Sequence, residues 1–327
     1  NARIAKRLRN EPSLFQEDME EAQVYAYDLD FHNQLKARLL EFRAVAQVVR
    51  DSSLVSSSED GRFKRRLQDP ATVAWNLTTT SFFKSGGRPW KLHDIRDGVC
   101  YIGIVFKVDP NDPYGRSACC GAQMFLDSGD GLVFKGAVGK WYSLESREFH
   151  LSEDKAFELL KTVLDEYREI HQASPKELFL HSRTRFNDEE WSGFIAAAAD
   201  VEKVTGVKIN RSSDLKAYRP GSTPVLRGTA LKLDRRRAYL WTAGFVPQIN
   251  TYAGREVPNP LLVEMTRGHD DLAQVLRDVM ALTKVNFNAC IYGDGLPVTL
   301  RFADAVGEIL TVGPAASLPP LPFRHYI

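Results

Sequence analysis

Alternating apolar and polar positions divide most of this chain into short strands and amphipathic helices. Three consecutive strands are predicted at Tyr101–Val108 (YIGIVFKV), 121–127 (GAQMFLD) and 131–137 (GLVFKGA). Apolar residues at helical spacing then predict a long helix from Glu153 to His171. Helices and strands alternate afterwards: strands at 177–181 and 203–209, two further short strands, helices at 188–200 and 270–282, and a last helix from about Ala303. This order predicts an α/β fold.

The N-terminal part of the chain predicts a smaller layer of its own. Residues 23–28 (QVYAYD) and 46–49 have strand character, and the helix predicted between them, 31–40, repeats apolar residues at every fourth position. Strand, helix, strand order favours a small α/β layer with a parallel sheet. Residues 51–66 are polar and rich in Ser, which predicts a loop. Gly-Gly followed by Pro in FKSGGRPWKL (83–92) marks the crossing to the next unit.

Length and composition favour a soluble protein of two domains. The chain has 327 residues, of which 43% are apolar, enough to bury a sizeable core. No apolar run approaches the roughly 18 residues that a membrane span requires, and the N-terminus has no apolar signal core. Asn1 in place of an initiator Met suggests that the sequence starts inside a longer polypeptide. We therefore expect a cytoplasmic protein with a further N-terminal portion.

The cysteines and the net charge narrow the chemistry only a little. Cys100, Cys119, Cys120 and Cys290 include no CxxC spacing and no nearby paired His, which argues against a zinc site or a disulfide framework. Lys plus Arg total 43 against 42 for Asp plus Glu, so the net charge of +1 does not by itself indicate nucleic-acid binding. Basic clusters occur at 3–9, 64–66 and 235–237, and such runs usually form solvated faces.

Three segments carry a resemblance to a known family. Residues 282–309, LTKVNFNACIYGDGLPVTLRFADAVGEI, resemble the end of the PIWI domain of Argonaute proteins, which bind a short guide nucleic acid and use it to find a complementary strand. YIGIVFKV and LFLHSRTRF (178–186) resemble the two PIWI strands that normally carry catalytic aspartates. The resemblance spans about 24–327. It implies a Rossmann-like MID domain at 1–94 and an RNase H-like PIWI domain at 95–327.

A set of polar residues resembles the MID pocket that holds the 5′-phosphate of a guide. His32 and Lys36 lie one turn apart on one face of the predicted helix, and Gln47 and Lys84 follow. Each alone is typical of an ordinary surface residue. Together they would give several charge-assisted hydrogen bonds to one phosphate. Many relatives have a further lysine where this chain has Thr80.

Two more groups are implied by the same resemblance. The chain ends LPFRHYI, and in related prokaryotic proteins the C-terminal carboxylate, here that of Ile327, reaches into the MID pocket and helps to hold Mg²⁺ on the guide phosphates. The alternative is a frayed terminus. Lys284, Asn286 and Asn288 would lie along the guide backbone near its 5′ end. Phosphate contacts of this kind position a strand, whereas base pairing reads its sequence.

The positions that would cut a target strand are degenerate. Active PIWI domains hold two metal ions with an Asp, a Glu, an Asp and a fourth Asp or His, because several carboxylates must offset the repulsion between the cations. Val105 stands at the first position and offers no oxygen. Arg183 stands at the third and would repel a metal ion. Only Asp304 matches the fourth position, and neither Glu145 nor Glu148 can be assigned to the second.

The MID-plus-PIWI layout is that of the short prokaryotic Argonautes, which are catalytically inactive as a family. They pair with an APAZ-containing partner whose sirtuin-like or TIR effector domain destroys NAD⁺. The resemblance therefore implies a protein that binds a guide RNA, recognises complementary single-stranded DNA and activates a partner NADase in defence against phage or plasmids. The alternatives are an autonomous guide-dependent nuclease and a guide-independent PIWI-like module that binds DNA.

Overall fold

The computed structural model describes most of the chain. The described residues are 31–49, 69–90, 96–108, 118–126, 131–252, 254, 256–285, 295–312 and 320–327. The predicted strand at 23–28 and the predicted loop at 51–66 lie outside this part of the chain, as do Asn286 and Asn288. Asp304 is described in its backbone only.

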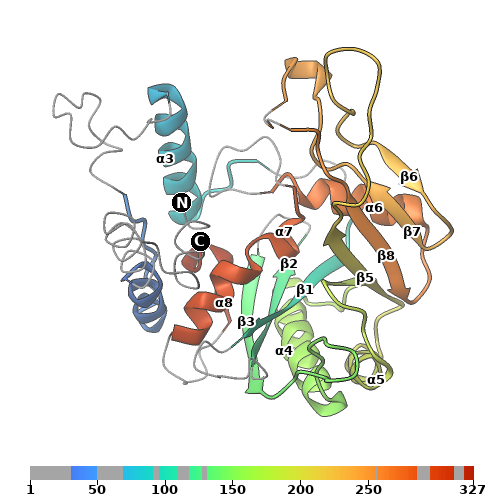
Figure 1. Cartoon of the computed structure of the whole chain (residues 1–327). Coiled ribbons are helices and arrows are strands. Elements are labelled where there is room, and N and C mark those ends of the chain that lie inside the picture. The colour runs from blue at the N-terminus through green and yellow to red at the C-terminus, as the bar shows by residue number, and fades with distance from the viewer. Residues whose placement is uncertain are drawn as a thin grey trace, which may run out of the picture.

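The described strands form one mixed sheet of nine strands, shown in Figure 1, in the order β6-β7-β8-β5-β4-β1-β2-β3-β9. In chain order they are β1 (Val99–Val108), β2 (Ala118–Phe125), β3 (Gly131–Gly139), β4 (Glu177–Ser182), β5 (Lys203–Arg211), β6 (Ala230–Lys232), β7 (Arg237–Leu240), β8 (Leu261–Arg267) and β9 (Leu321–Pro322). β1, β2 and β3 are joined as antiparallel neighbours, while β4 runs parallel to both β1 and β5. The predicted α/β class is confirmed.

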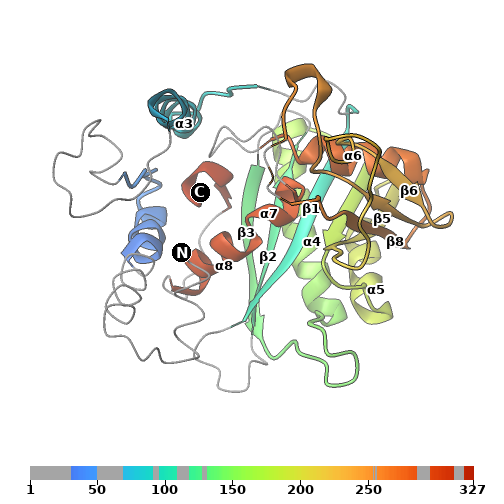
Figure 2. The ribbon, with the colours of Figure 1, turned by 45° about the horizontal axis from the view of Figure 1, so that its top comes forward.

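Helices cover both faces of the sheet. The helices described are residues 31–41, α3 (Pro70–Lys84), α4 (Glu153–His171), α5 (Asp188–Ala197), α6 (Leu272–Leu282), α7 (Val298–Arg301) and α8 (Ala303–Val312), with 3₁₀ turns η2 (Pro247–Ile249) and η3 (Phe323–His325). Side chains alternate across β1, as the pleat requires. Ile102 and Ile104 pack with α4 and α5, whereas Tyr101 and Val105 pack in the core that α6, α7 and α8 cover. Figure 2 shows α4 and α5 on one side of the sheet and α7 and α8 on the other.

Local sequence explains the best-predicted elements. Helix α4 has the predicted bounds, because its buried residues recur at helical spacing and Gln172 ends it in the left-handed conformation. Helix α5 begins where predicted, since the side chain of Asn187 accepts a hydrogen bond from the backbone N–H of Glu190. It ends at Ala197, three residues before the predicted end.

Several predicted details differ from the structure. The strand predicted at 46–49 is wrong: residues 44–49 form neither helix nor strand, and the carbonyl of Ala46 accepts a hydrogen bond from Lys84. Helix α3 was not predicted, although Asp69 caps it and Pro70 occupies its first turn, a combination that signals a helix start. Between β5 and α6 there are three strands, not two.

The C-terminal residues join the N-terminal helices to the sheet. β9 pairs antiparallel with β3, so the tail extends the sheet at that edge. Phe323, Tyr326 and Ile327 are buried in the same core cluster as Ala37 and Phe83 from the two N-terminal helices. The tail is therefore packed and not frayed. Among the described helices, none combines the length and the apolar character needed to cross a membrane.

Candidate nucleic-acid interface

Two lysines from different helices are buried side by side next to the C-terminal residues. Only 4% of Lys36 and 9% of Lys84 is exposed. The Nζ of Lys36 donates a hydrogen bond to the carbonyl of Tyr326 at 3.3 Å, and the Nζ of Lys84 donates to the carbonyl of Ala46 at 2.7 Å. Neither lysine forms an ion pair with a carboxylate of the described residues. In this part of the chain, each ammonium group is thus hydrogen-bonded to a main-chain carbonyl and to no carboxylate.

Burial disfavours the charged form of both side chains. Burial first, and then the positive charge of Lys84, lower the pKa of Lys36 from 10.5 to about 7. Burial also lowers the pKa of Lys84 to about 8. The pKa of the partly buried His32 falls as well, through burial first and then through Lys36 and Lys84. The charges of these three residues influence one another, and a bound anion would raise all three pKa values again.

The predicted pocket residues are not all brought together. His32, Lys36 and Lys84 gather as predicted, and Tyr326 brings the C-terminus beside them. Gln47 is exposed, and its amide donates to the adjacent carbonyl of Val48 at 3.2 Å. The structure therefore gives Gln47 no described contact with either lysine.

Glu308 is an acidic residue of the interface that the sequence alone did not predict. The carboxylate of Glu308, on α8, accepts a hydrogen bond from Asn33 at 3.4 Å and forms an ion pair with Lys107 of β1 at 3.0 Å. Its negative charge also raises the pKa of His32 against the larger opposing effects. Glu308 thus links the helix at 31–41 to the sheet. No local pattern signals this role, because the three partners are far apart in sequence.

The tail supports the pocket from the other side. Ile327 is only 5% exposed and its side chain lies in the core, as the sequence predicts. The ring Nδ1 of His325 lies 3.3 Å from the carbonyl of Ala44, in the segment that follows the helix at 31–41. Burial lowers the pKa of His325, which favours the neutral ring. The tail is therefore fixed on both sides of Tyr326.

The residues predicted to stand at two of the cutting positions lie just past the last paired residues of the parallel strands β1 and β4. β1 and β4 pair as far as Gly103 and His181, and Val105 and Arg183 each lie two residues further on. Val105 is 7% exposed and packs in the core below α7 and α8. Gly103 permits this packing, because a Cβ there would lie 2.0 Å from the carbonyl oxygen of Thr299 in α7. Arg183 is exposed, and its carbonyl accepts a hydrogen bond from Asn210.

The acidic candidates do not form a metal centre among the described residues. There, no group of three or more His, Cys, Asp or Glu is placed to hold a metal ion. Glu148 lies 3.7 Å from the Nζ of Lys208 and 3.8 Å from the Nε2 of His150, and Glu145 is exposed. The side chain of Asp304 lies outside the described part of the structure.

Of the three residues predicted to follow the guide backbone, only Lys284 is described. It is exposed directly after α6, and its carbonyl accepts a hydrogen bond from the indole N–H of Trp90 at 3.0 Å. This contact ties the segment after α3 to the segment after α6. The side chain of Lys284 is thereby held at the surface.

The structure is similar to solved Argonautes. Clostridium butyricum Argonaute, bound to a guide DNA and a 19-mer target DNA, matches with a TM-score of 0.66 and 15% identity over 89% of this chain and 37% of its own. A. aeolicus Argonaute matches with a TM-score of 0.61 and 15% identity over 98% and 46%, and a structure of Aa-Ago with externally bound siRNA with 0.59 and 15% over 90% and 38%. The chain has an Argonaute-like fold.

The likeness confirms the fold class, a Rossmann-like MID domain followed by an RNase H-like PIWI domain. The boundary between them at residues 94 and 95 stays a prediction. This Argonaute-like chain spans less than half the length of each of these solved structures. No protein-family model matches the sequence, and no curated protein does either.

Proposed function

We propose that this chain binds a 5′-phosphorylated guide RNA and uses it to recognise complementary single-stranded DNA without cutting it. The observation that carries the proposal is the buried pair Lys36 and Lys84, whose charges meet no carboxylate in the described part of the chain. A phosphate monoester supplies the missing negative charge and accepts charge-assisted hydrogen bonds from both lysines. The Argonaute-like fold supports this assignment, since the solved relatives include complexes with guide and target strands.

The lowered pKa values make the pocket respond to its ligand. With pKa values of about 7 and about 8, the two lysines lose protons near neutral pH more readily than exposed lysines do. A bound phosphate raises both pKa values again, because it favours the charged forms. Guide binding should therefore take up protons, and its affinity should fall as the pH rises above about 7.

His32, Gln47 and the C-terminal Ile327 complete the proposed site for the guide 5′-phosphate. His32 lies beside the lysines and can stack on the first base of the guide. The amide of Gln47 uses one of its two N–H donors on the carbonyl of Val48, which leaves the other for the phosphate. Mg²⁺ fits this site only together with the guide, because the described side chains provide no cluster of metal ligands. Phosphate oxygens would supply most of its ligands and the carboxylate of Ile327 one more. Bound there, Mg²⁺ would neutralise phosphate charge.

Lys284, Asn286 and Asn288 are proposed to contact the guide backbone.

The same reasoning separates recognition from cutting. By resemblance, Val105 and Arg183 stand where active PIWI domains carry two catalytic aspartates, so the site would lack the negative charge that two metal ions require. We propose that recognition of a target instead activates the NADase of an APAZ-containing partner, sirtuin-like or TIR. The resemblance to short prokaryotic Argonautes supports this step.

The test measures affinity for one RNA sequence with a 5′-phosphate and with a 5′-hydroxyl. The wild type should prefer the 5′-phosphate. Lys84→Met should weaken binding of that form by about 1.5–3 kcal/mol, the range for hydrogen bonds to charged groups, with little effect on the 5′-hydroxyl form. Lys176→Met removes an exposed lysine just before β4 and is the control. Equal affinities for the two RNA forms would contradict the assignment of this pocket to a 5′-phosphate. Sequencing the nucleic acid that co-purifies with the protein is a second test: random fragments, instead of short 5′-phosphorylated RNAs, would indicate a guide-independent module.

A further inference from the structure

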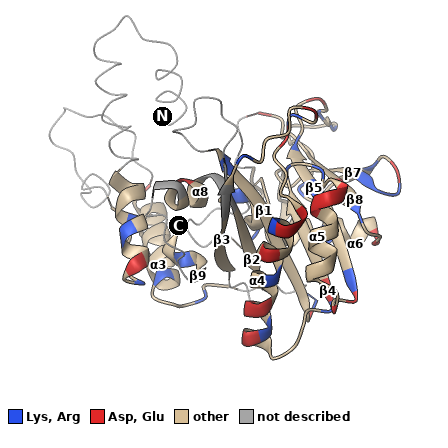
Figure 3. Ribbon diagram, turned by 90° about the horizontal axis from the view of Figure 1, so that it is seen from below, with Lys and Arg blue, Asp and Glu red and all other residues tan. Residues whose placement is uncertain are grey.

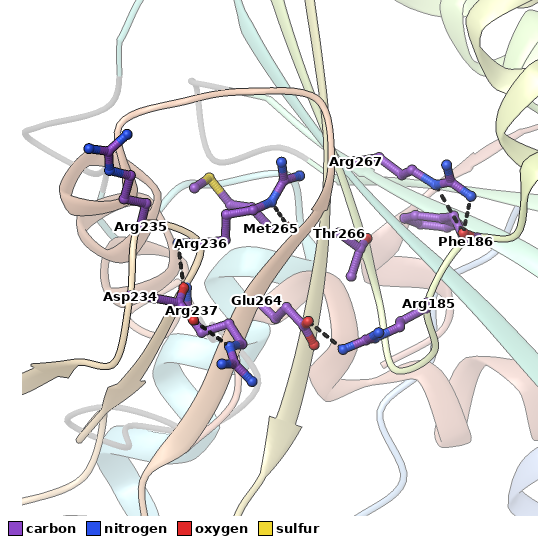
Figure 4. A pocket seen from close by; sticks show the side chains of 10 residues that line it. All are labelled: Arg185, Phe186, Asp234, Arg235, Arg236, Arg237, Glu264, Met265, Thr266 and Arg267. Carbon is purple, nitrogen blue, oxygen red and sulfur yellow. Dashed lines mark hydrogen bonds and ion pairs between the residues drawn. The ribbon is translucent and has the colours of Figure 1, made fainter.

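A second basic site lies at the other end of the sheet from the buried lysines. It is a hollow of about 580 Å³ between the loop after β4, the β6–β7 turn and strand β8. Five arginines line it: Arg185, Arg235, Arg236, Arg237 and Arg267. Figure 4 shows Arg235 and Arg236 on one side of the hollow and Arg185 and Arg267 on the other. In Figure 3 the basic turn projects from the edge of the sheet beside β7 and β8.

The two acids of the hollow do not neutralise it. Glu264 pairs with Arg185 at 2.5 Å, and Asp234 pairs with Arg237 at 2.7 Å. Each acid is thus already paired with one arginine side chain, while the guanidinium of Arg236 forms no ion pair with a carboxylate among the described residues. Arg235 is exposed and forms no hydrogen bond or ion pair there. The formal charge of the lining residues is positive by three.

Main-chain carbonyls hold two of the guanidinium groups in place. Arg236 donates from Nε to the carbonyl of Met265 at 2.8 Å and from Nη2 to that of Gly268 at 3.0 Å. Arg267 donates from Nε and Nη2 to the carbonyl of Phe186, and pairs with the exposed Asp188 at 2.5 Å. A carbonyl orients a guanidinium without cancelling its charge, so Arg236 keeps its full charge, whereas Asp188 offsets that of Arg267. Little side-chain entropy is then lost when an anion binds.

The hollow is distant from the lysine pocket and lies on the opposite face of the sheet from the side chain of Val105, and the loop after β4 that lines it also contains Arg183. Glu264 and Thr266 face the α5 side of the sheet, since the alternate residues Val263 and Met265 of β8 lie in the core under α6. Val105 points to the α6–α8 side. β8 and β9 are six positions apart in the sheet, which is roughly 29 Å at the usual strand spacing. A ligand here does not occupy the lysine pocket beside the tail.

We propose that this arginine hollow binds the phosphodiester backbone of a nucleic-acid strand. The lining presents donors, because its carbonyls at Phe186 and Met265 are already occupied by arginines. A phosphodiester carries acceptors and no donor, so it matches this lining. An acidic peptide would bring one backbone N–H per residue and would need acceptors that the hollow has committed. The exclusive use of arginine also suits the two-oxygen edge of a phosphate group. This site is independent of guide 5′-phosphate capture.

Arg235→Glu tests the proposal with the least risk to folding, because Arg235 is exposed. The probe is a labelled single-stranded oligonucleotide with a 5′-hydroxyl, titrated at several salt concentrations. We expect the affinity to fall at least about fivefold, and the slope of log affinity against log salt to shrink by about 0.7 for one lost phosphate contact. Arg235→Lys should keep most of the slope. Lys176→Glu makes the same type of charge change away from the hollow and should match the wild type.

Two outcomes overturn the proposal. One is an Arg235→Glu protein whose affinity and salt slope equal those of the wild type. The other is an Arg235→Glu protein that keeps its oligonucleotide affinity but loses binding of a poly-glutamate peptide. That result would make the hollow a site for acidic peptides. The preference for a 5′-phosphate over a 5′-hydroxyl should survive in Arg235→Glu and be lost in Lys84→Met. Failure of this site and failure of the guide pocket are therefore distinguishable.

Discussion

Replacing Lys36 with Met should stabilise the free protein while impairing its binding to a phosphorylated guide. Burial and the charge of Lys84 lower the pKa of Lys36 from 10.5 to about 7. At about 1.36 kcal/mol per pKa unit, this difference corresponds to roughly 5 kcal/mol that the charged side chain costs the folded state. Met fills a similar volume without the charge. It also loses the hydrogen bond to the carbonyl of Tyr326, which offsets about 1–3 kcal/mol of the gain.

The pH dependence identifies the cause. Below a pH of about 7 the lysine is charged in both the folded and the unfolded chain, so the full cost is present. As the pH rises from about 7 towards 10.5, the folded chain releases the proton first and the cost disappears. We therefore expect Lys36→Met to be more stable than the wild type by about 2–4 kcal/mol near pH 6.5, and this advantage to shrink by about 2–3 kcal/mol near pH 9.

Denaturant unfolding of both proteins across this pH range, in a buffer without phosphate, measures the difference. Lys176→Met, which removes an exposed lysine, should show no comparable gain. A 5′-phosphorylated oligonucleotide should stabilise the wild type more than Lys36→Met, because a ligand stabilises the state that binds it. A variant no more stable than the wild type, or equally favoured at both pH values, would refute the assignment of a buried, charged Lys36.

Two other changes probe the tail and the degenerate cutting positions. Residues appended after Ile327, which is buried, should weaken guide binding and reduce its dependence on Mg²⁺; an unaltered Mg²⁺ titration would show that the carboxylate has no part in the site. Guide-loaded protein should bind labelled complementary DNA and RNA and leave both intact in Mg²⁺ and in Mn²⁺. The Asp304→Ala protein should bind the target as tightly as the wild type. A discrete cut that the Asp304→Ala change abolishes would overturn the non-cutting assignment.

Much of the fold follows from local patterns in the sequence. Spacing of apolar residues predicts α4 with its bounds and the strands around Val105 and Arg183, because helix and strand periodicity depend on neighbouring residues. Helix α3 was missed although Asp69 and Pro70 signal its start. The prediction of a strand at 46–49 was wrong because β propensity takes effect only through pairing with other strands. In this segment the carbonyl of Ala46 instead accepts a hydrogen bond from Lys84.

The sequence by itself determines which residues are available: lysines at 36 and 84, no carboxylate at 105 or 183, and a run of arginines at 235–237. Only the tertiary structure decides what they can do. Lys36 meets the carbonyl of Tyr326 across 290 positions of the chain, and that burial, not its place on a helix, lowers its pKa. The arginine hollow likewise joins three separate segments. Such sites depend on the order of strands in the sheet and on the exclusion of water, which no local pattern specifies.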